Sequence, residues 1–356
     1  MPIAPRIAVL TFHRCINYGS YWQARCLVEG LRERGHGAVL LDHHSERVKR
    51  AEWRSALQPL LPKRSEKADL PLYAGKTRRF LDAIDSLPLS KPFALDRPWE
   101  MDPHELVLVG SDEVWNLRHP WYGGHPVFFG EGVRAGQIAS YAASFGNQDA
   151  GEGLDGRWAG KLRDFSRISI RDQNSRRLVE DALGCEPELV LDPCLQFSHL
   201  IEGKALRRLP PYLAVYGHGF PQWFIDNVRV FAQDKGLRLI SIGYRNDWAD
   251  EQWIDAGPEE FAGFMAGAQA VVTTFFHGCV FALVNQKPFA CALTDYRSNK
   301  IRDLTETVGA QRHLVGQETP SSHYWDILGE APERTIPHRI AILKRRSDAY
   351  LDAVCN

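Results

Sequence analysis

Short apolar runs alternate with stretches of helical spacing along most of the chain, and this alternation is the strongest constraint on its fold. In the first half a strand at residues 7–11, a helix capped by Ser20 and ended by Gly35, and a strand at 38–41 form a βαβ unit. The alternation returns in the second half, from the strand at 212–216 onward. The sequence therefore predicts an α/β protein with two Rossmann-like, doubly wound domains facing each other across a cleft.

The chain length supports a division into two domains. At 356 residues the chain exceeds what a single hydrophobic core usually supports. We expect an N-terminal domain at 1–195 with a charged, proline-bearing insertion at about 47–103, and a C-terminal domain at 196–335. The amphipathic run at 336–356 predicts a helix that packs back on the first domain.

Composition excludes several classes of protein. Hydrophobic residues make up 44% and charged residues 24%, and the formal net charge is -1, so no global field draws the chain to nucleic acid or to an anionic membrane. The sequence has no run of about 18 apolar residues, and its first residues lack the features of a secretory signal. Seven scattered cysteines without a C-x-x-C pair favour reduced thiols, a cytoplasmic location and no metal site.

The stretch at 270–291 (AVVTTFFHGCVFALVNQKPFAC) carries the first candidate residue for chemistry. An apolar β-branched run at 271–274 leads to His277 and Gly278, and a run with helical spacing follows. His277 is thus expected at a helix N-terminus, outside the carboxyl end of a parallel strand, where open α/β sheets bind ligands. A histidine there can hydrogen-bond an anion and exchange a proton with it. A capping or packed histidine is the alternative.

Polar residues also follow two strands of the first half. The strand at 106–109 leads to GSDEVWN (110–116), in which Ser111 offers a hydroxyl and Asp112 a carboxylate that can accept a proton. The strand at 168–170 leads to Arg171, which can grip a carboxylate or phosphate bidentately. The alternatives are a turn and cap pair for Ser111 and Asp112, and an ion pair of Arg171 with Asp172 or another acid.

A loop containing Asn17, Tyr18 and Gly19 follows the first strand and is a further ligand-facing candidate, although it lacks the G-x-G-x-x-G order of dinucleotide-binding loops. Together these segments occur in the order seen in the polysaccharide pyruvyl transferase family, which the chain resembles. The resemblance is carried by N-Y-G at 17–19, G-S-D-x-V-W-N at 110–116, Y-A-A-S-F-G at 141–146, S-I-R-D at 169–172, L-D-P at 191–193, P-E-E-F at 258–261, F-H-G-x-V-F-A at 276–282 and K-P-F at 287–289.

The resemblance implies a fold like that of the B-type (GT-B) glycosyltransferases and transfer of a pyruvyl group from phosphoenolpyruvate to two sugar hydroxyls, forming a cyclic ketal. In this interpretation Arg171 is the clamp for the anionic donor and His277 is the acid. The amides of Gly278 and Cys279 would cradle phosphate oxygens. Arg297 and Lys300 lie in a stretch that resembles the family's basic segment and would add positive charge at the donor.

We assign the acceptor to the first domain, with Asn17, Tyr18, Gly19, Ser111 and Asn116 as candidate contacts. Asp112 is the candidate base for the acceptor hydroxyl. The scheme requires no metal and no cofactor besides phosphoenolpyruvate as co-substrate. The expected partners are a small-molecule donor and a sugar or glycan acceptor, without nucleic acid. Peripheral contact with a membrane-borne glycan and the oligomeric state stay open.

One position departs from the family pattern. Many relatives carry arginine or serine two residues before the histidine, where this chain has Phe275. A guanidinium at that position would add a charge-assisted contact to the donor, typically worth about 1.5–3 kcal/mol. Two alternatives follow: a glycosyltransferase that uses a nucleotide sugar, with Phe275 stacked on the base, or a sugar-binding relative without catalytic activity.

Overall fold

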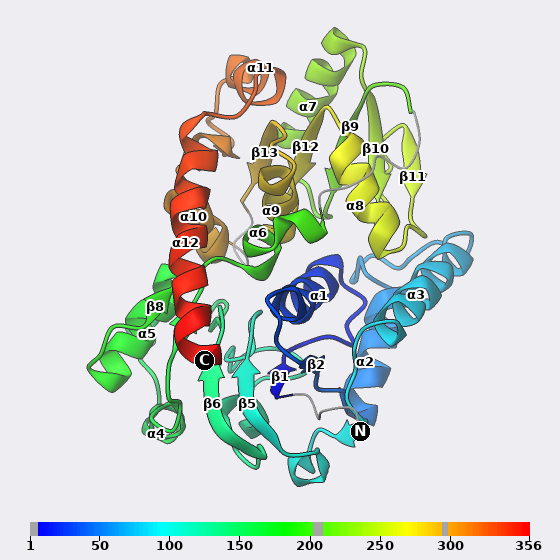
Figure 1. Ribbon diagram of the computed structural model, residues 1–356. Helices are drawn as coiled ribbons and strands as arrows, with labels where there is room; N and C mark the ends of the chain where they lie inside the picture. Colours follow the sequence, from blue (N-terminus) through cyan, green and yellow to red (C-terminus); the bar gives the residue numbers. More distant parts are fainter. Residues whose placement is uncertain (1–5, 202–208, 294–297) are drawn as a thin grey trace. The chain divides into compact units, whose positions relative to one another are not determined.

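The computed structural model describes residues 6–201, 209–293 and 298–356, and contacts within the chain divide it into two compact units (Figure 1). Unit 1 consists of Met1–Glu52, Ile84–Leu200 and Ala341–Asn356. Unit 2 consists of Trp53–Ala83 and Ile201–Ile340. Each unit thus combines segments from distant parts of the sequence.

Unit 1 is built on a sheet whose described strands are all parallel, in the order β2-β1-β5-β6. These are β2 (Ala38–Leu40), β1 (Ile7–Leu10), β5 (His104–Val109) and β6 (Ala135–Ser140). Two short parallel pairs join β3 (His43–His44) to β4 (Phe93–Ala94) and β7 (Ser169–Ile170) to β8 (Glu188–Leu189). The helices are α1 (Tyr18–Glu33), the first part of α2 (Glu46–Leu57), α4 (Gly156–Leu162), α5 (Gln173–Leu183) and α6 (Pro193–Gln196), with 3-10 turns at Pro98–Glu100, Pro126–Phe129, Ala150–Glu152 and Ser198–Leu200.

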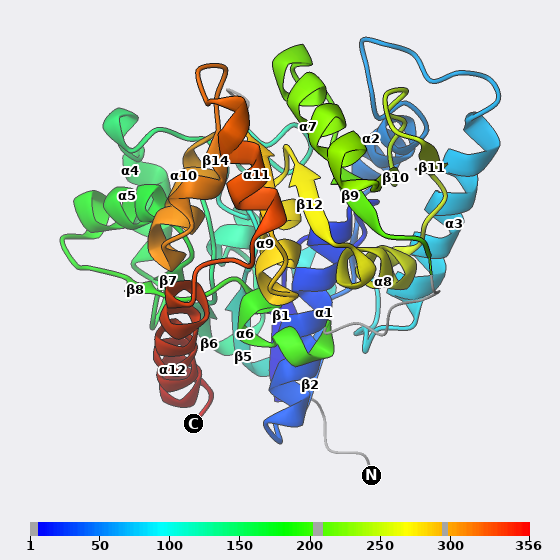
Figure 2. The same ribbon diagram turned by 90° about the horizontal axis from the view of Figure 1, so that it is seen from above.

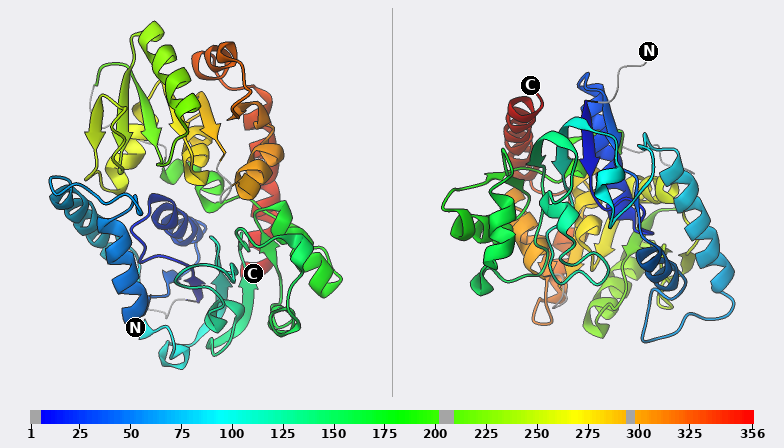
Figure 3. Two further views of the ribbon diagram at one scale, coloured as in Figure 1. Left: turned by 180° about the vertical axis from the view of Figure 1, so that it is seen from behind. Right: turned by 90° about the horizontal axis from the view of Figure 1, so that it is seen from below.

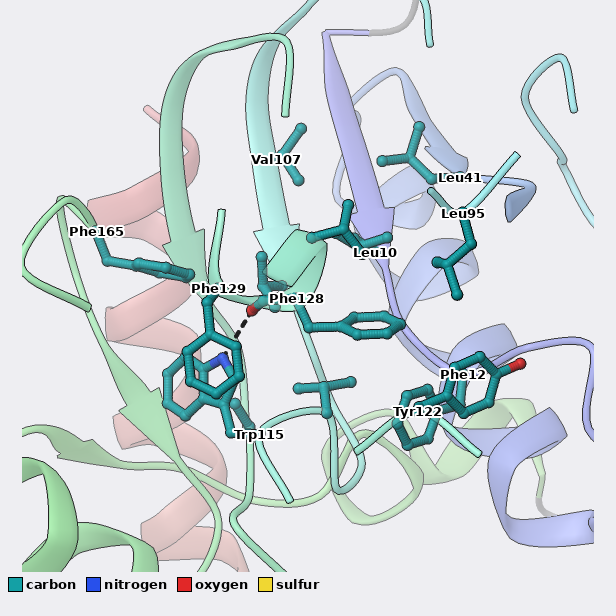
Figure 4. Close-up of a cluster of buried hydrophobic side chains, with 14 of the residues drawn as sticks. Leu10, Phe12, Leu41, Leu95, Val107, Trp115, Tyr122, Phe128, Phe129 and Phe165 are labelled. Carbon is teal, nitrogen blue, oxygen red and sulfur yellow. Dashed lines mark hydrogen bonds between the residues drawn. The ribbon is translucent and has the colours of Figure 1, made fainter. Parts of the chain in front are cut away.

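The core of unit 1 is aromatic on the side of the sheet drawn in Figure 4. Trp115 is fully buried, and its indole N–H donates to the carbonyl oxygen of Phe128 over 2.8 Å. Phe12 stacks on Tyr122 with ring centroids 4.3 Å apart. Phe12 lies in the loop after β1, and Trp115 lies in the loop after β5. Their packing therefore fixes the loops at the carboxyl ends of both strands.

The C-terminal helix α12 (Thr335–Cys355) packs against unit 1, as the sequence predicted. The hydroxyl of Ser347 accepts from the amide of Leu191 over 2.9 Å, and the hydroxyl of Tyr350 donates to the carbonyl of Ser140 over 2.7 Å. Both contacts are buried, so the helix completes the unit rather than resting on its surface.

Unit 2 contains a sheet that is parallel throughout its described strands, in the order β11-β10-β9-β12-β13-β14. They are β11 (Glu251–Trp253), β10 (Arg238–Ile242), β9 (Tyr212–Tyr216), β12 (Ala270–Thr273), β13 (Phe289–Ala292) and β14 (Leu314–Val315). In Figure 2 α7 and α11 lie on one side of β9 and β12, and α8 and α9 lie on the other. The helices are α3 (Leu70–Asp85), α7 (Gln222–Lys235), α8 (Pro258–Gly267), α9 (Phe276–Val284), α10 (Ser298–Val308) and α11 (Ser321–Gly329), with a 3-10 turn at Gln311–His313.

The insertion at 47–103, which we assigned to the first domain, is divided between the units, because residues 53–83 group with unit 2. The amine of Lys76 on α3 donates to the carbonyl of Gly243 over 3.0 Å, directly after β10. Arg245 pairs with Asp69 at 3.1 Å. These contacts join segments more than 160 residues apart, and the insertion has no hydrophobic period that could have indicated them.

The start of α1 also differs from the prediction. Asn17, not Ser20, is its N-cap, and the Asn17 side chain accepts from the amides of Gly19 and Ser20 over 2.8 and 3.2 Å. The hydroxyl of Ser20 instead donates to Oδ2 of Asp112 over 2.9 Å. The helix therefore begins three residues earlier than serine capping predicts, and Ser20 is available for a contact with β5's loop.

Candidate functional sites at the switch points of the two sheets

The order of strands places a switch point in unit 2 between β9 and β12. From β9 the chain continues to β10 and β11 on one side, and β12, β13 and β14 lie on the other. In open α/β sheets ligands bind outside the carboxyl ends of the strands at such a point. The loops there begin at Gly217 and Thr274, and the hydroxyl of Thr274 donates to the carbonyl of His218 over 3.1 Å.

His277 lies at the N-terminus of α9, as the sequence predicted. Phe275 is the N-cap, so His277 is the second residue of the helix, and the preceding strand β12 is parallel to both neighbours. The hydroxyl of Thr273 donates to the carbonyl of Tyr216 over 2.6 Å and accepts from the amide of Phe275 over 3.0 Å, which fixes the turn. As a residue His277 is partly exposed, whereas the residues on either side of it are buried, and Nε2 of its imidazole is a buried atom.

The amides of Gly278 and Cys279, which we expected to cradle phosphate, have a partner within the helix. They donate to the carbonyl of Phe275 over 3.0 and 3.3 Å and close the first turn of α9. Gly278 is required for packing, because a Cβ at that position would lie 2.0 Å from the hydroxyl oxygen of Thr273. Cys279 is fully buried, and its contact with the Cys291 thiol and its burial raise the pKa of its own thiol.

Phe275 belongs to an aromatic cluster at this sheet edge. Its ring makes edge contacts with Tyr216, His218 and Tyr244, with centroids 5.1, 5.2 and 5.4 Å away. The amine of Lys76 lies 4.4 Å from the Tyr244 ring centroid, and burial lowers the pKa of this amine to about 7. Because only 7% of Phe275 is exposed, its ring is committed to the cluster.

In unit 1 the switch point lies between β1 and β5, because β2 lies on one side of β1 and β5 with β6 on the other. Ser111 is fully buried there and belongs to an internal network. Its hydroxyl donates to Oε1 of Gln23 over 2.6 Å, and its carbonyl accepts from the hydroxyl of Thr11 over 2.8 Å. Ser111 therefore fixes the loop after β5 through these two contacts.

Asp112, the residue after Ser111, has a left-handed backbone conformation with a φ angle of 73°. Such a conformation is uncommon outside glycine and is concentrated at functional sites. Oδ2 accepts from Ser20, and Oδ1 accepts from the amide of Glu113 over 2.9 Å and from Nη2 of Arg171 over 3.2 Å. The side chain retains 12% exposure, so the carboxylate is oriented by neighbours on several sides.

Arg171 pairs with two carboxylates within unit 1. In addition to Asp112, Oδ2 of Asp192 accepts from Nη1 over 2.8 Å, and the arginine side chain is 2% exposed. Burial opposes the charge, but the carboxylates of Asp112 and Asp192 raise the pKa of Arg171. Asp172, which we named as an ion-pair partner, instead caps α5 by accepting from the amide of Ser175 over 2.7 Å.

Comparison with known proteins decides the family. The sequence profile described as polysaccharide pyruvyl transferase matches residues 17–296, a range that covers most of the chain and includes the loops after β5 and β12. The chain belongs to the polysaccharide pyruvyl transferase family. A search of the curated proteins finds no match.

Two solved structures show the fold of this pyruvyl transferase family member. The UDP-GlcNAc 2-epimerase of Neisseria meningitidis, bound to UDP-GlcNAc, has a TM-score of 0.52 at 9% identity and covers 97% of this chain and 98% of its own. The UDP-GlcNAc 2-epimerase of Methanocaldococcus jannaschii has a TM-score of 0.51 at 11% identity, covering 92% and 93%. The predicted fold class, with two Rossmann-like domains of the GT-B kind, is confirmed.

The remaining residues that we expected to contact the acceptor differ in how exposed they are to solvent. Asn17 is exposed, but its side chain caps α1, and Tyr18 and Gly19 are buried in the first turn of that helix. Asn116 is 2% exposed and donates to Oε2 of Glu113 over 2.8 Å. Of these acceptor candidates, only Asn17 reaches the surface.

Arg297 and Lys300 are the two basic residues that we expected to contact the donor. Lys300 lies on α10 and is partly exposed. Arg297 lies outside the residues that the structure describes. No described helix of this family member is long and apolar enough to cross a membrane.

Two residues near the switch points escaped the sequence analysis. His218 lies between two glycines directly after β9, and a G-H-G sequence at the end of a strand could have revealed it. Glu52 is buried on α2, where Oε2 accepts from the amide of Ile16 over 3.2 Å in the loop after β1. Burial raises the pKa of Glu52 to about 7. The sequence around Glu52 has no comparable motif, because Glu52 is one acidic residue in a charged segment.

Proposed function

We propose that this chain is a transferase that moves a pyruvyl group from phosphoenolpyruvate to two hydroxyls of a sugar or glycan. The products are a cyclic ketal and inorganic phosphate. The family match carries the proposal, because it spans the loops after β5, β7 and β12 that bear Asp112, Arg171 and His277. The exposure of His277 amid buried neighbours supports a role for its imidazole in chemistry.

In this reaction His277 is the acid that protonates the donor. A charged imidazole gives its proton to the methylene carbon of the donor, which becomes a methyl group, and C2 becomes electrophilic. The first hydroxyl then attacks C2 and loses its proton. When the C2–O bond to the phosphate breaks, phosphate leaves with the bonding electrons and takes up the proton of the first hydroxyl. The second hydroxyl attacks C2 to close the ketal, and its proton passes to the neutral imidazole of His277. An adjacent dianionic donor offsets the tendency of a helix N-terminus to keep the imidazole neutral.

Asp112 is the base in this proposal, accepting the proton of the attacking hydroxyl. Hydrogen bonds from the hydroxyl of Ser20, the amide of Glu113 and the guanidinium of Arg171 hold the carboxylate in one orientation. The left-handed backbone of Asp112 supports this role, because strain of this kind persists where the surroundings hold a functional geometry.

For Arg171 the contacts support a positioning role rather than the donor clamp that we expected from the family resemblance. One guanidinium between the carboxylates of Asp112 and Asp192 leaves a group with net negative charge, which opposes binding of an anionic donor. The same two contacts hold Asp112 in a fixed orientation. We therefore infer that Arg171 acts on the reaction through Asp112.

Turnover of the purified protein tests the proposal. The protein is incubated with phosphoenolpyruvate and a set of methyl glycosides, and phosphate release and pyruvyl ketals are measured, the latter by mass spectrometry. Ketal formation that depends on His277 supports the proposal. Release of a nucleoside diphosphate from a nucleotide sugar, without phosphate release from phosphoenolpyruvate, would establish the glycosyltransferase alternative. Sugar binding without turnover of either donor would establish an inactive relative.

A further inference from the structure

The segment from the last turns of α2 to the first turn of α3 exposes large apolar side chains among basic ones. Trp53 is 42% exposed, Leu61 48% and Leu72 37%, and across the described residues the other large apolar side chains with comparable exposure are Trp99 and Val230. Residues 53–67, which we call the basic tip, contain four exposed cations: Arg54, Lys63, Arg64 and Lys67. Figures 2 and 3 show the loop of the basic tip extending away from the helices that it joins.

The basic tip consists of the end of α2 and a loop that hydrogen bonds hold closed. The amide of Ser65 donates to Oε1 of Gln58 over 2.7 Å, and its hydroxyl donates to the carbonyl of Leu57 over 3.0 Å. These bonds close the loop and leave Leu61 at its middle. At the base of α3, Asp69 is tied to unit 2 by its ion pair with Arg245. The exposure of Leu61 is therefore a property of a closed loop and not of an extended chain end.

The charge of the basic tip differs from that of the whole chain. Against four cations the tip carries one acid, Glu66, whereas the formal net charge of the chain is -1. Lys63 pairs with Asp247 at 3.2 Å, but both side chains are more than half exposed. An exposed tryptophan and leucine flanked by cations match the interface of an anionic bilayer, where rings and aliphatic chains enter the headgroup region and cations contact lipid phosphates.

We propose that the basic tip binds the surface of an anionic lipid bilayer, with Trp53 and Leu61 inserted among the headgroups and Arg54, Arg64 and Lys67 on their phosphates. This surface would bring the chain to acceptors that are held on lipids. The inference is independent of the proposed function, because vesicle binding needs neither donor nor acceptor.

Sedimentation of the full chain with vesicles tests the inference. Vesicles of equal parts phosphatidylglycerol and phosphatidylcholine are compared with vesicles of phosphatidylcholine alone. We expect binding to the anionic vesicles that weakens as salt is added. The pair Arg64→Gln and Lys67→Gln is expected to lower the affinity about 30-fold. The pair Trp53→Ser and Leu61→Ser is expected to lower it about tenfold or more.

Matched control variants separate the basic tip from the rest of the surface. The pair Trp99→Ser and Val230→Ser removes apolar side chains elsewhere that are more exposed than those of the tip. The pair Arg177→Gln and Arg229→Gln removes two exposed cations elsewhere. Both control pairs should bind like the unaltered chain. Circular dichroism verifies that every variant is folded.

Three results would overturn the inference. The first is no sedimentation with anionic vesicles, and the second is equal sedimentation with phosphatidylcholine alone. The third is binding to heparin, a polyanion without an apolar layer, that is as strong as vesicle binding and unchanged by the Trp53 and Leu61 substitutions. That third result would show that the tip recognises negative charge in general.

Discussion

Nη2 of Arg171 donates to Oδ1 of Asp112 over 3.2 Å, and this buried contact joins the loop after β7 to the loop after β5. Its neighbour Nη1 donates to Asp192. A single guanidinium thus compensates two carboxylates, and both the stability of unit 1 and the orientation of Asp112 depend on it.

The substitution Arg171→Gln should therefore destabilise the protein by about 3–5 kcal/mol, because it leaves buried carboxylates without their cation. The change is measured by urea unfolding of the purified protein. Arg177→Gln, on the exposed face of α5, is the matched control and should change stability by less than about 0.5 kcal/mol. Equal stability of the two variants would show that the ion pairs of Arg171 contribute nothing to the fold.

Gly278 gives a second prediction about stability. An alanine there would place its Cβ 2.0 Å from the hydroxyl oxygen of Thr273, so Gly278→Ala should cost about 1–3 kcal/mol through overpacking. Gly160 on α4 has open space around its Cβ position, and Gly160→Ala should stabilise by about 0.5–1 kcal/mol. Thermal unfolding compares the two, and the account fails if both substitutions shift the midpoint in the same direction.

The buried amine of Lys76 should make the free energy of unfolding depend on pH. Burial lowers the pKa of its amine from 10.5 to about 7 in the fold, so between these values the unfolded chain binds one proton more than the folded chain. The free energy of unfolding should therefore rise with pH across this window, and Lys76→Met should remove that part of the rise. Urea unfolding at several pH values measures it, with Lys49→Met, an exposed lysine on α2, as control. Identical pH profiles for both variants would refute the prediction.

Glu52 predicts the opposite slope at lower pH. Burial raises the pKa of this carboxyl from 4.5 to about 7, so between these values the folded chain holds a proton that the unfolded chain has lost. Stability from this group is present below pH 4.5 and is lost as the pH rises to about 7. Glu52→Gln, a neutral isostere, should be more stable than the unaltered chain above pH 7, whereas Glu46→Gln, exposed on the same helix, should not. A loss of stability in Glu52→Gln at pH 8 would contradict this.

Local patterns predicted much of the fold. The apolar run before His277 became β12, and the helical spacing after it became α9, so the position of His277 outside a parallel strand followed from about ten residues of sequence. Strands β11 and β14 and helix α11 were not predicted. The two strands are short, and periodicity is weak over a few residues.

The contacts of the candidate residues could not be predicted, because they join distant parts of the chain. Ser20 reaches Asp112 across 92 residues, and Arg171 reaches Asp112 across 59. Gln23, which holds Ser111, is a single polar residue in a helix and has no local signature. Residue types at strand ends indicate where ligands can bind, whereas tertiary packing decides which of those side chains are already engaged.

Calorimetric titration of phosphoenolpyruvate into the purified protein tests the central claim most directly. The account predicts that the unaltered chain binds phosphoenolpyruvate, that His277→Asn binds it more weakly, and that Gly160→Ala binds it unchanged. Binding of a nucleotide sugar without binding of phosphoenolpyruvate, or equal binding of phosphoenolpyruvate by His277→Asn, would contradict it.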